Sequence, residues 1–253
     1  MLMRGKVCVV TGAASLQGIG RATAHMLAAN GAHVAVIDVS ENVADVAGEI
    51  AKDHASSSIL GVKCNIVDSA ACEEAAAKVS RVFNQVDALV HCAGVIRSGR
   101  YDEISRKDFD EVIAVNLSGA FNILRSFIPA MVAQRSGSIV NVASVAAQRG
   151  GGLVGGSHYA ASKGAVLSLT KSLARELGPM GVRVNAVCPS LIETDFVTSA
   201  VSKDRIRDLT AAIPLGRAGR PDEVAAACMF LASDLSSYIT GATLDVNGGS
   251  HIH

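Results

Sequence analysis

The sequence lacks the charge excess and the long apolar runs that mark several classes of protein. Its 253 residues carry 23 Lys or Arg and 23 Asp or Glu. No basic surplus therefore favours a nucleic-acid partner or an anionic membrane surface. The longest apolar runs, such as residues 7–10 and 34–37, are far shorter than the roughly 20 residues of a membrane-spanning helix. We expect neither a nucleic-acid nor a membrane partner.

Cysteine motifs are also missing. The six cysteines are scattered, with no Cys-x-x-Cys and no Cys/His cluster at metal-ligand spacing, which excludes the common zinc-binding patterns. The first residues lead straight into a strand-like run without a signal-peptide pattern. We therefore expect reduced cysteines, no metal site and a cytoplasmic protein.

What the sequence does contain is a regular alternation of apolar β-branched runs and amphipathic stretches, with no internal repeat or linker. It predicts a single α/β domain over residues 1–253, with about seven parallel strands in a doubly wound sheet and helices on both faces. The expected strands cover residues 7–10, 33–38, 59–64, 86–91, 138–143, 182–187 and 243–246. The expected helices cover residues 21–30, 42–54, 69–83, a long segment ending near 134, 159–177 and 221–232. Residues 190–215 are expected to form a mobile helical segment at the substrate.

A glycine-rich turn follows the first strand. Gly12 ends the strand, and Gly18, Ile19 and Gly20 precede the first helix. Glycines let a backbone approach a pyrophosphate closely, and a helix N-terminus offers free N–H groups to it. A tight turn without a ligand is the alternative, but strand, glycine turn and helix in this order favour a dinucleotide site.

Asp38 lies at the end of the second strand, 18 residues after Gly20. A carboxylate there can accept hydrogen bonds from both ribose hydroxyls of an adenosine, and it would repel a 2′-phosphate. No Lys or Arg lies between Thr11 and Gly20. The pattern favours NAD over NADP as cofactor. Asp38 could alternatively cap the following helix.

Tyr159 and Lys163 lie four residues apart in a stretch with helical periodicity, so both side chains share one helix face. A nearby ammonium favours the phenolate form of tyrosine, and a tyrosine of lowered pKa can act as a general acid or base on a carbonyl or alcohol. Taken alone, this spacing is also common on solvated helix faces.

In order and spacing, these motifs resemble those of the short-chain dehydrogenase/reductase family over almost the whole chain. The matching residues are Gly12, Gly18, Gly20, Asp38, Ala93, Gly94, Asn116, Ser144, Tyr159, Lys163, Pro189 and Thr194. The resemblance implies a Rossmann-like fold and a catalytic set of Asn116, Ser144, Tyr159 and Lys163. Ser144 would hold the substrate oxygen and Tyr159 would transfer the proton. Lys163 would lower the tyrosine pKa and bind the nicotinamide ribose, and Asn116 would anchor a proton-relay water.

The same resemblance implies further cofactor contacts and a homotetramer. The implied contacts are Gly12, Gly18, Ile19, Gly20, Asp38, Asn65, Ile66, Ala93, Gly94, Tyr159, Lys163, Pro189, Ile192 and Thr194. The chain departs from the family pattern by two extra residues in the glycine turn, for which Leu16 and Gln17 are expected to bulge outward. It departs again in the glycine-rich residues 149–158, which are expected to line the substrate entrance.

These observations predict an NAD-dependent oxidoreductase that interconverts a secondary alcohol, of the polyol, sugar or hydroxy-acid type, and its ketone. A 3-oxoacyl-carrier-protein-reductase-like enzyme using NADP is the alternative enzyme, and a cofactor-binding scaffold without turnover is the alternative from another class. Arg97, Arg149 and His158 fall on segments that border the site in this family. They could bind a substrate carboxylate or hydroxyls, or could be solvated surface residues.

Overall fold

The computed structural model of the protein describes residues 1–151, 154–198 and 203–253. Within these residues, seven strands form one parallel sheet with the order β3-β2-β1-β4-β5-β6-β7. The strands are β1 (Val7–Thr11), β2 (His33–Asp38), β3 (Ile59–Lys63), β4 (Ala88–His91), β5 (Gly137–Val142), β6 (Val182–Pro189) and β7 (Thr243–Val246). The predicted α/β class and the number of strands are confirmed.

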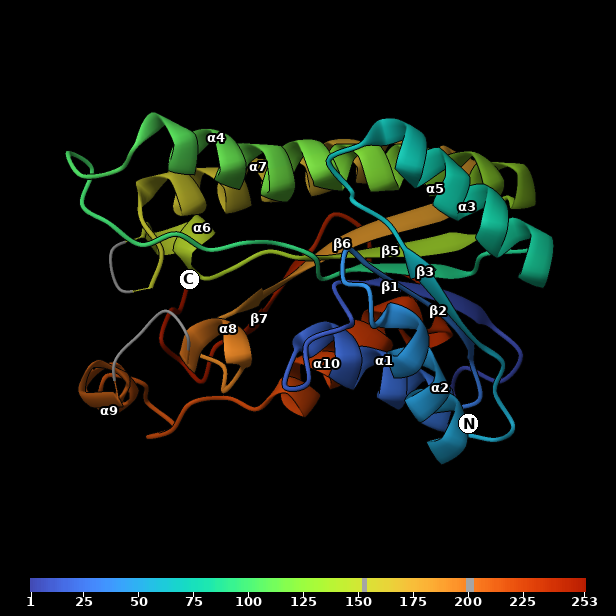
Figure 1. Ribbon diagram of the computed structural model, residues 1–253, viewed down its shortest axis with the longest axis horizontal. Helices are drawn as coiled ribbons and strands as arrows, with labels where there is room; N and C mark the ends of the chain where they lie inside the picture. The colour runs from blue at the N-terminus through green and yellow to red at the C-terminus, as the bar shows by residue number, and fades with distance from the viewer. Residues whose placement is uncertain (152–153, 199–202) are drawn as a thin grey trace.

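Helices cover both faces of the sheet (Figure 1). One layer holds α1 (Ile19–Ala29), α2 (Val43–Asp53) and α10 (Pro221–Ala232). The other holds α3 (Ser69–Phe83), α4 (Arg106–Ile113), α5 (Ala120–Gln134) and α7 (Ser157–Leu177). Shorter elements are the π-helical turn η1 (Ala114–Gly119), the 3₁₀ turns η2 (Gly178–Met180) and η3 (Asp234–Ser236), and the helices α6 (Ala146–Arg149), α8 (Asp195–Thr198) and α9 (Lys203–Ala211).

Each face of the sheet has its own hydrophobic core, because strands buried on both sides carry apolar residues at nearly every position. On the α1–α10 side, Val10, Val36 and Leu231 belong to one buried cluster. On the α3–α5–α7 side, Phe127 and Met131 belong to another. Burial of these side chains fixes the rigid strands whose carboxyl ends carry the polar residues described below.

Element boundaries differ from prediction where side chains compete for backbone groups. The fourth strand begins at Ala88 rather than residue 86. The reason is that the side chain of Gln134 forms hydrogen bonds with both backbone groups of Val86: its Oε1 accepts from Val86 N at 3.1 Å, and its Nε2 donates to Val86 O at 2.9 Å. The predicted single long helix is interrupted by η1, and the helix α6 was not predicted.

The continuous helical segment Arg106–Gln134 is, by length and composition alone, long and apolar enough to cross a membrane. In the folded protein it lies in the layer of α3 and α7 above the sheet (Figure 1), and its residues Ile123, Phe127 and Met131 are buried against that sheet. Its apolar character is accounted for in part by this packing.

The segment predicted to move near the substrate, residues 190–215, is described at 190–198 and 203–215, where it contains α8 and α9. Residues 199–202 lie outside the described residues, as do residues 152–153 of the glycine-rich stretch 149–158. The helices α6, α8 and α9 and the C-terminus gather at one end of the sheet (Figure 1). Because α6 comes directly after β5 in the chain, this is the end of the sheet at which the carboxyl ends of the parallel strands lie.

Candidate active site

A cavity of about 740 Å³ opens at the carboxyl edge of the sheet. Its walls come from the residues that follow β1, β2, β4, β5 and β6, and from α6 to α9 and the C-terminal residues. The order of strands reverses between β1 and β4, and ligands of open α/β sheets bind beside such a reversal. The cavity therefore lies where ligands bind in open α/β sheets, beside the reversal of strand order between β1 and β4.

The glycine turn forms one end of this cavity. Gly12 has a φ of +69°, and a Cβ placed on it would lie 2.7 Å from the backbone of Ala93. A Cβ on Gly20 would collide with the carbonyl of Gly12. These close approaches require glycine, and they bring the start of α1 to the cavity wall. No side chain caps α1, and its first turn contains no acidic residue, so its N–H groups remain available to an anion.

Asp38 lines the same end of the cavity. Its two carboxylate oxygens accept hydrogen bonds from Ala14 N and Ser40 N, at 2.9 and 3.0 Å. The N-cap position of α2 is Asn42, and Ser40 precedes that helix, so Asp38 does not cap the following helix, which was the alternative expected for it. Lys63, which lies beside Asp38 in the register of β2 and β3, is paired with Glu41, and Arg21 in the first turn of α1 is paired with Glu49.

A buried histidine supports the turn after β4. The Nδ1 atom of His91 lies 2.9 Å from the hydroxyl of Thr11, which also accepts hydrogen bonds from Cys92 N and Ala93 N. Because the threonine oxygen accepts twice, its proton is donated to His91. Burial lowers the pKa of His91 to about 3, so the ring stays neutral and the backbone at Cys92 and Ala93 is held against Gly12.

The two-residue insertion in the glycine turn bulges outward as predicted, with Leu16 72% exposed. The structure adds a contact that the sequence did not indicate. One carboxylate oxygen of Asp195, at the start of α8, accepts hydrogen bonds from the Ser15 hydroxyl at 2.8 Å and from Gln17 N at 3.0 Å. This contact joins the inserted turn to the segment after β6.

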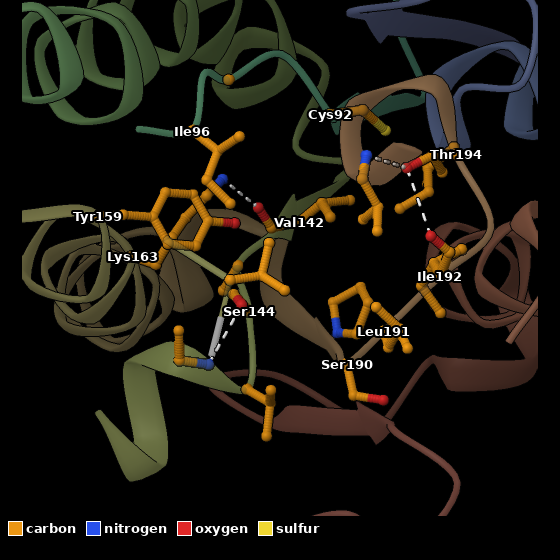
Figure 2. A pocket seen from close by; sticks show the side chains of 18 of the residues that line it. Cys92, Ile96, Val142, Ser144, Tyr159, Lys163, Ser190, Leu191, Ile192 and Thr194 are labelled. Carbon is orange, nitrogen blue, oxygen red and sulfur yellow. Dashed lines mark hydrogen bonds between the residues drawn. The ribbon is translucent and has the colours of Figure 1, made fainter. Parts of the chain in front are cut away.

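Tyr159 and Ser144 both line the cavity, and the Tyr159 hydroxyl points toward its middle, while the Ser144 hydroxyl accepts a hydrogen bond from Ala146 N (Figure 2). Tyr159 is 7% exposed. Burial raises its pKa to about 12, and the neighbouring Ser144 hydroxyl opposes that rise. The expected lowering of the tyrosine pKa by Lys163 is therefore not found in the free protein, since desolvation of the phenolate outweighs the effect of its neighbours.

Lys163 lies one helical turn after Tyr159 on α7. Its ammonium donates a hydrogen bond of 2.8 Å to the carbonyl of Val142, at the end of β5 (Figure 2). Burial lowers its pKa to about 8. A Cβ on Gly94 would lie 3.4 Å from this ammonium and 3.1 Å from Oδ1 of Asn116, so Gly94 leaves room for both side chains.

Asn116 lies in the π-helical turn η1, an irregularity often found at functional sites, and is 1% exposed. Its Oδ1 accepts a hydrogen bond from Val95 N, and its Nδ2 donates to Val95 O and to the Ser162 hydroxyl. The side chain thus ties the turn after β4 to the residue that precedes Lys163. It does not line the cavity.

Three more predicted residues follow β6 along the cavity wall: Pro189, Ile192 and Thr194. Thr194 donates its N–H to Ile192 O at 2.8 Å, and its hydroxyl donates to the same carbonyl (Figure 2). By contrast, Asn65 and Ile66 are absent from the cavity lining. The amide oxygen of Asn65 accepts from Val67 N, and Ile66 is buried against Gly119.

Sequence reasoning missed the groups that make up the rest of the cavity. They include the carbonyl of Val142, Asp195, and an aliphatic wall of Ile96, Val145, Val154, Leu191, Val197, Leu209 and Ile213. No local signal distinguishes these residues, because they meet only when β5, β6, α8 and α9 converge.

A dinucleotide fold and a tyrosine–lysine–serine group in one cavity define the class of protein, an oxidoreductase. The family model described as Enoyl-(Acyl carrier protein) reductase matches residues 12–251. The chain is 42% identical over 250 residues to a 3-oxoacyl-[acyl-carrier-protein] reductase of Thermotoga maritima, covering 98% of this chain and 99% of that protein. It is 40% identical over 246 residues to a D-threitol dehydrogenase of Mycolicibacterium smegmatis, covering 97% and 92%.

Among solved structures, a protein from Beutenbergia cavernae named as an NAD(P)-dependent gluconate 5-dehydrogenase, with NADP bound at low occupancy, superimposes with a TM-score of 0.90. The two are 40% identical, and the match covers 98% of this chain and 97% of that chain. The chain belongs to the short-chain dehydrogenase/reductase family. It is an NAD(P)-dependent oxidoreductase that acts on CH–OH groups.

The buried lysine has a measurable consequence for stability. Lysine in an unfolded chain keeps its proton up to a pKa of about 10.4, whereas Lys163 in the folded protein releases it near pH 8. Between these values the unfolded chain binds more protons, so the free energy of unfolding rises with pH. In urea unfolding, the wild type should gain about 2 kcal/mol between about pH 7.5 and about pH 9.5 relative to Lys163→Met.

Lys171→Met, which removes an exposed lysine from the same helix, is the control and should keep the wild-type pH dependence. If Lys163→Met and the wild type gain stability equally over this range, the folded protein holds Lys163 charged and the assignment of its pKa is wrong.

Proposed function

We propose that the protein is an NAD-preferring enzyme that interconverts a secondary alcohol, of the polyol, sugar or hydroxy-acid type, and its ketone, with Tyr159 as general acid and base. The observation that carries the proposal is the meeting of Tyr159, Ser144 and Lys163 in one cavity that also contains the glycine turn. A protein that only bound the dinucleotide would need neither the serine nor the tyrosine there.

The residues present fit a dinucleotide. The free N–H groups at the start of α1 suit a pyrophosphate, and Gly12, Gly18 and Gly20 keep side chains out of its path. Ala93, Gly94, Pro189, Ile192 and Thr194 would bound the cofactor toward the catalytic residues. Asn65 and Ile66 lie outside the cavity lining, so their predicted contact with adenine is the part of the cofactor site with least support.

In the proposed reaction, NAD held in this cavity would supply the hydride acceptor for the carbinol carbon, and its reduced form would supply the hydride in the reverse direction. The Ser144 hydroxyl donates a hydrogen bond to the substrate oxygen. Tyr159 lies beside Ser144 in the cavity; as the phenolate it takes the alcohol proton, and as the phenol it gives a proton to the carbonyl oxygen. Lys163 binds the nicotinamide ribose and stabilises the phenolate once its ammonium turns from Val142 toward the cavity. Asn116 fixes the backbone at Val95 and α7 at Ser162, and so orients both groups.

The acyl-carrier-protein reductase activity remains a second candidate. The name of the Thermotoga maritima relative and the description of the matching family model support it, and the aliphatic wall of the cavity suits an acyl chain. Against it, the adenosine end of the cavity presents Asp38 while Lys63 and Arg21 are both paired, which disfavours the 2′-phosphate of NADP.

The free state of all six cysteines supports a cytoplasmic location for the protein. No group of three or more potential metal ligands occurs among the described residues. His253 instead lies 3.0 Å from Asp245, and its ring packs edge-on against His251.

Cofactor preference tests the role of Asp38. The catalytic efficiency should be higher with NAD than with NADP. Asp38→Ala should weaken NAD binding about tenfold to a hundredfold, the range of a hydrogen bond to a charged group, and should narrow the gap between the two cofactors. Asp45→Ala, which removes an exposed carboxylate from α2, serves as control. Equal or better efficiency of the wild type with NADP would show that Asp38 does not select the cofactor.

Substitution of the catalytic pair tests the chemistry. Tyr159→Phe should abolish hydride transfer, followed by nicotinamide absorbance, while NAD affinity stays close to that of the wild type. Lys163→Ala should impair both, because it also removes a bond to the ribose. The two effects should be non-additive in the double variant. Tyr101→Phe, at a tyrosine that is 87% exposed, is the matched control. Near-normal turnover by Tyr159→Phe would place the general base elsewhere.

We also propose a homotetramer. Phe109 and Phe121 on the long helical segment are 41% and 51% exposed, and β7 is an edge strand of the sheet, so an apolar face and an open edge are available for other copies of the chain. Sedimentation at micromolar concentration should give four chains, and Phe121→Glu should give a smaller species. A monomeric wild type would refute the assembly.

A further inference from the structure

Among the described side chains that line the substrate half of the cavity, which is formed by α6, α8, α9 and the aliphatic wall named above, there is one arginine. Sequence reasoning named Arg97, Arg149 and His158 as residues that could contact substrate, and the structure separates them. Arg97 is held by Glu111 through two hydrogen bonds, at 2.7 and 3.2 Å. His158 is 2% exposed and does not line the cavity. Only Arg149 lines it.

The guanidinium of Arg149 has donors to spare. It gives one hydrogen bond, from Nη1 to the carbonyl of Ser250 at 2.9 Å. Among the described residues, no carboxylate lies within ion-pair distance of it. The planar guanidinium carries five N–H groups and matches a carboxylate with two parallel hydrogen bonds. The cavity's other cation, Lys163, is directed to Val142 O.

The position of Arg149 is fixed relative to the reacting groups. It is the last residue of α6, which begins two residues after Ser144, and the Ser144 hydroxyl accepts a hydrogen bond from Ala146 N. The short helix therefore keeps the backbone of Arg149 close to Ser144 in the fold. The preceding residue, Gln148, donates to Asp245 of β7 at 2.8 Å. Both ends of α6 are thus anchored, and Arg149 has a defined place at the cavity rim.

The side chains that line this half of the cavity are mainly aliphatic, with Ile96, Val145, Val154 and Leu191 among them, beside a few polar ones such as Ser190 and Asp208. Extra hydroxyls of a sugar or polyol that faced the aliphatic side chains would have no partner there, and a desolvated hydroxyl without a partner is costly. A hydroxy acid needs only two polar contacts, one at its carbinol and one at its carboxylate.

We infer that the substrate is a hydroxy acid or the corresponding oxo acid, whose carboxylate binds Arg149 while its carbinol lies at Ser144 and Tyr159. This inference rests on the proposed hydride transfer and narrows its substrate class. Arg149 is then the residue that determines specificity for a charged substrate over a neutral one.

The test compares linear hydroxy acids, with one to four carbons between the carbinol carbon and the carboxylate, each with its own primary amide. The quantity measured is the ratio of kcat/KM for the acid to kcat/KM for its amide, with NAD. The wild type should prefer the acid of at least one pair. In Arg149→Gln this ratio should fall about tenfold or more, as expected for loss of a charged hydrogen bond, with the change mainly in KM for the acid.

Two further variants separate charge from structure. Arg149→Lys keeps the charge but loses the paired hydrogen bonds, so its ratio should lie between those of the wild type and Arg149→Gln. Arg81→Gln removes an exposed arginine from α3, away from the cavity, and should keep the wild-type ratio. Added salt should raise KM for the acid in the wild type more than in Arg149→Gln.

The failure of this inference differs from failure of the proposed function. If the enzyme transfers hydride but turns over acids and amides equally, or if Arg149→Gln keeps the wild-type ratio, Arg149 does not bind a carboxylate and the inference is overturned while the function stands. If Tyr159→Phe retains turnover on the same panel, the proposed catalytic group itself is wrong.

Discussion

The burial of one ammonium group is the constraint on which the rest of this site depends. Lys163 is 5% exposed and gives a hydrogen bond to the carbonyl of Val142. A charge in such a place is costly unless backbone or side-chain groups bind it, and its pKa is lowered to about 8. The carboxyl end of β5 supplies the acceptor, and α7 supplies the lysine. The relation between this strand and this helix therefore also sets where Tyr159, one turn earlier, meets Ser144.

Around this group the protein uses small residues to let backbones approach one another. Gly12, Gly20 and Gly94 each stand where an added Cβ would crowd a neighbouring strand turn or a catalytic side chain. Neutral polar side chains then hold the turns in place. His91 and Thr11 fix the backbone at Cys92 and Ala93, and Asn116 fixes Val95 to α7. The cavity is in this sense a set of backbone turns held together by buried hydrogen bonds.

The two halves of the cavity differ in chemistry. The half with the glycine turn offers free N–H groups and Asp38, while the other half offers aliphatic side chains with Arg149 at its rim. The first arrangement is general to dinucleotide-binding sheets. The second depends on the short helices α6, α8 and α9. The relatives are named for different activities, and a change in these helices would change the part of the cavity that faces the substrate.

Periodicity and spacing were enough to predict the fold class, the seven strands, the shared helix face of Tyr159 and Lys163, and the glycine turn, whereas Ser144 was expected from the family resemblance. Buried parallel strands require continuous apolar runs, glycine turns require glycine, and helical spacing places residues four apart on one face. These are local requirements, so the sequence displays them. The start of β4, the π-helical turn at Asn116 and the bond between Asp195 and the inserted turn are set by groups distant in sequence, such as Gln134 for Val86 and Ser15 for Asp195.

The charge states of Tyr159 and Lys163 were decided by the tertiary structure alone. The sequence places an ammonium next to a phenol and thereby predicts a lowered tyrosine pKa. In the folded protein, burial raises the pKa of Tyr159 to about 12, because desolvation depends on all the elements that cover the side chain. The same holds for the three residues named as substrate contacts, of which the packing of Glu111 and the enclosure of His158 leave only Arg149 at the cavity. Local sequence thus determined which groups are present, and long-range packing determined which of them remain free to act.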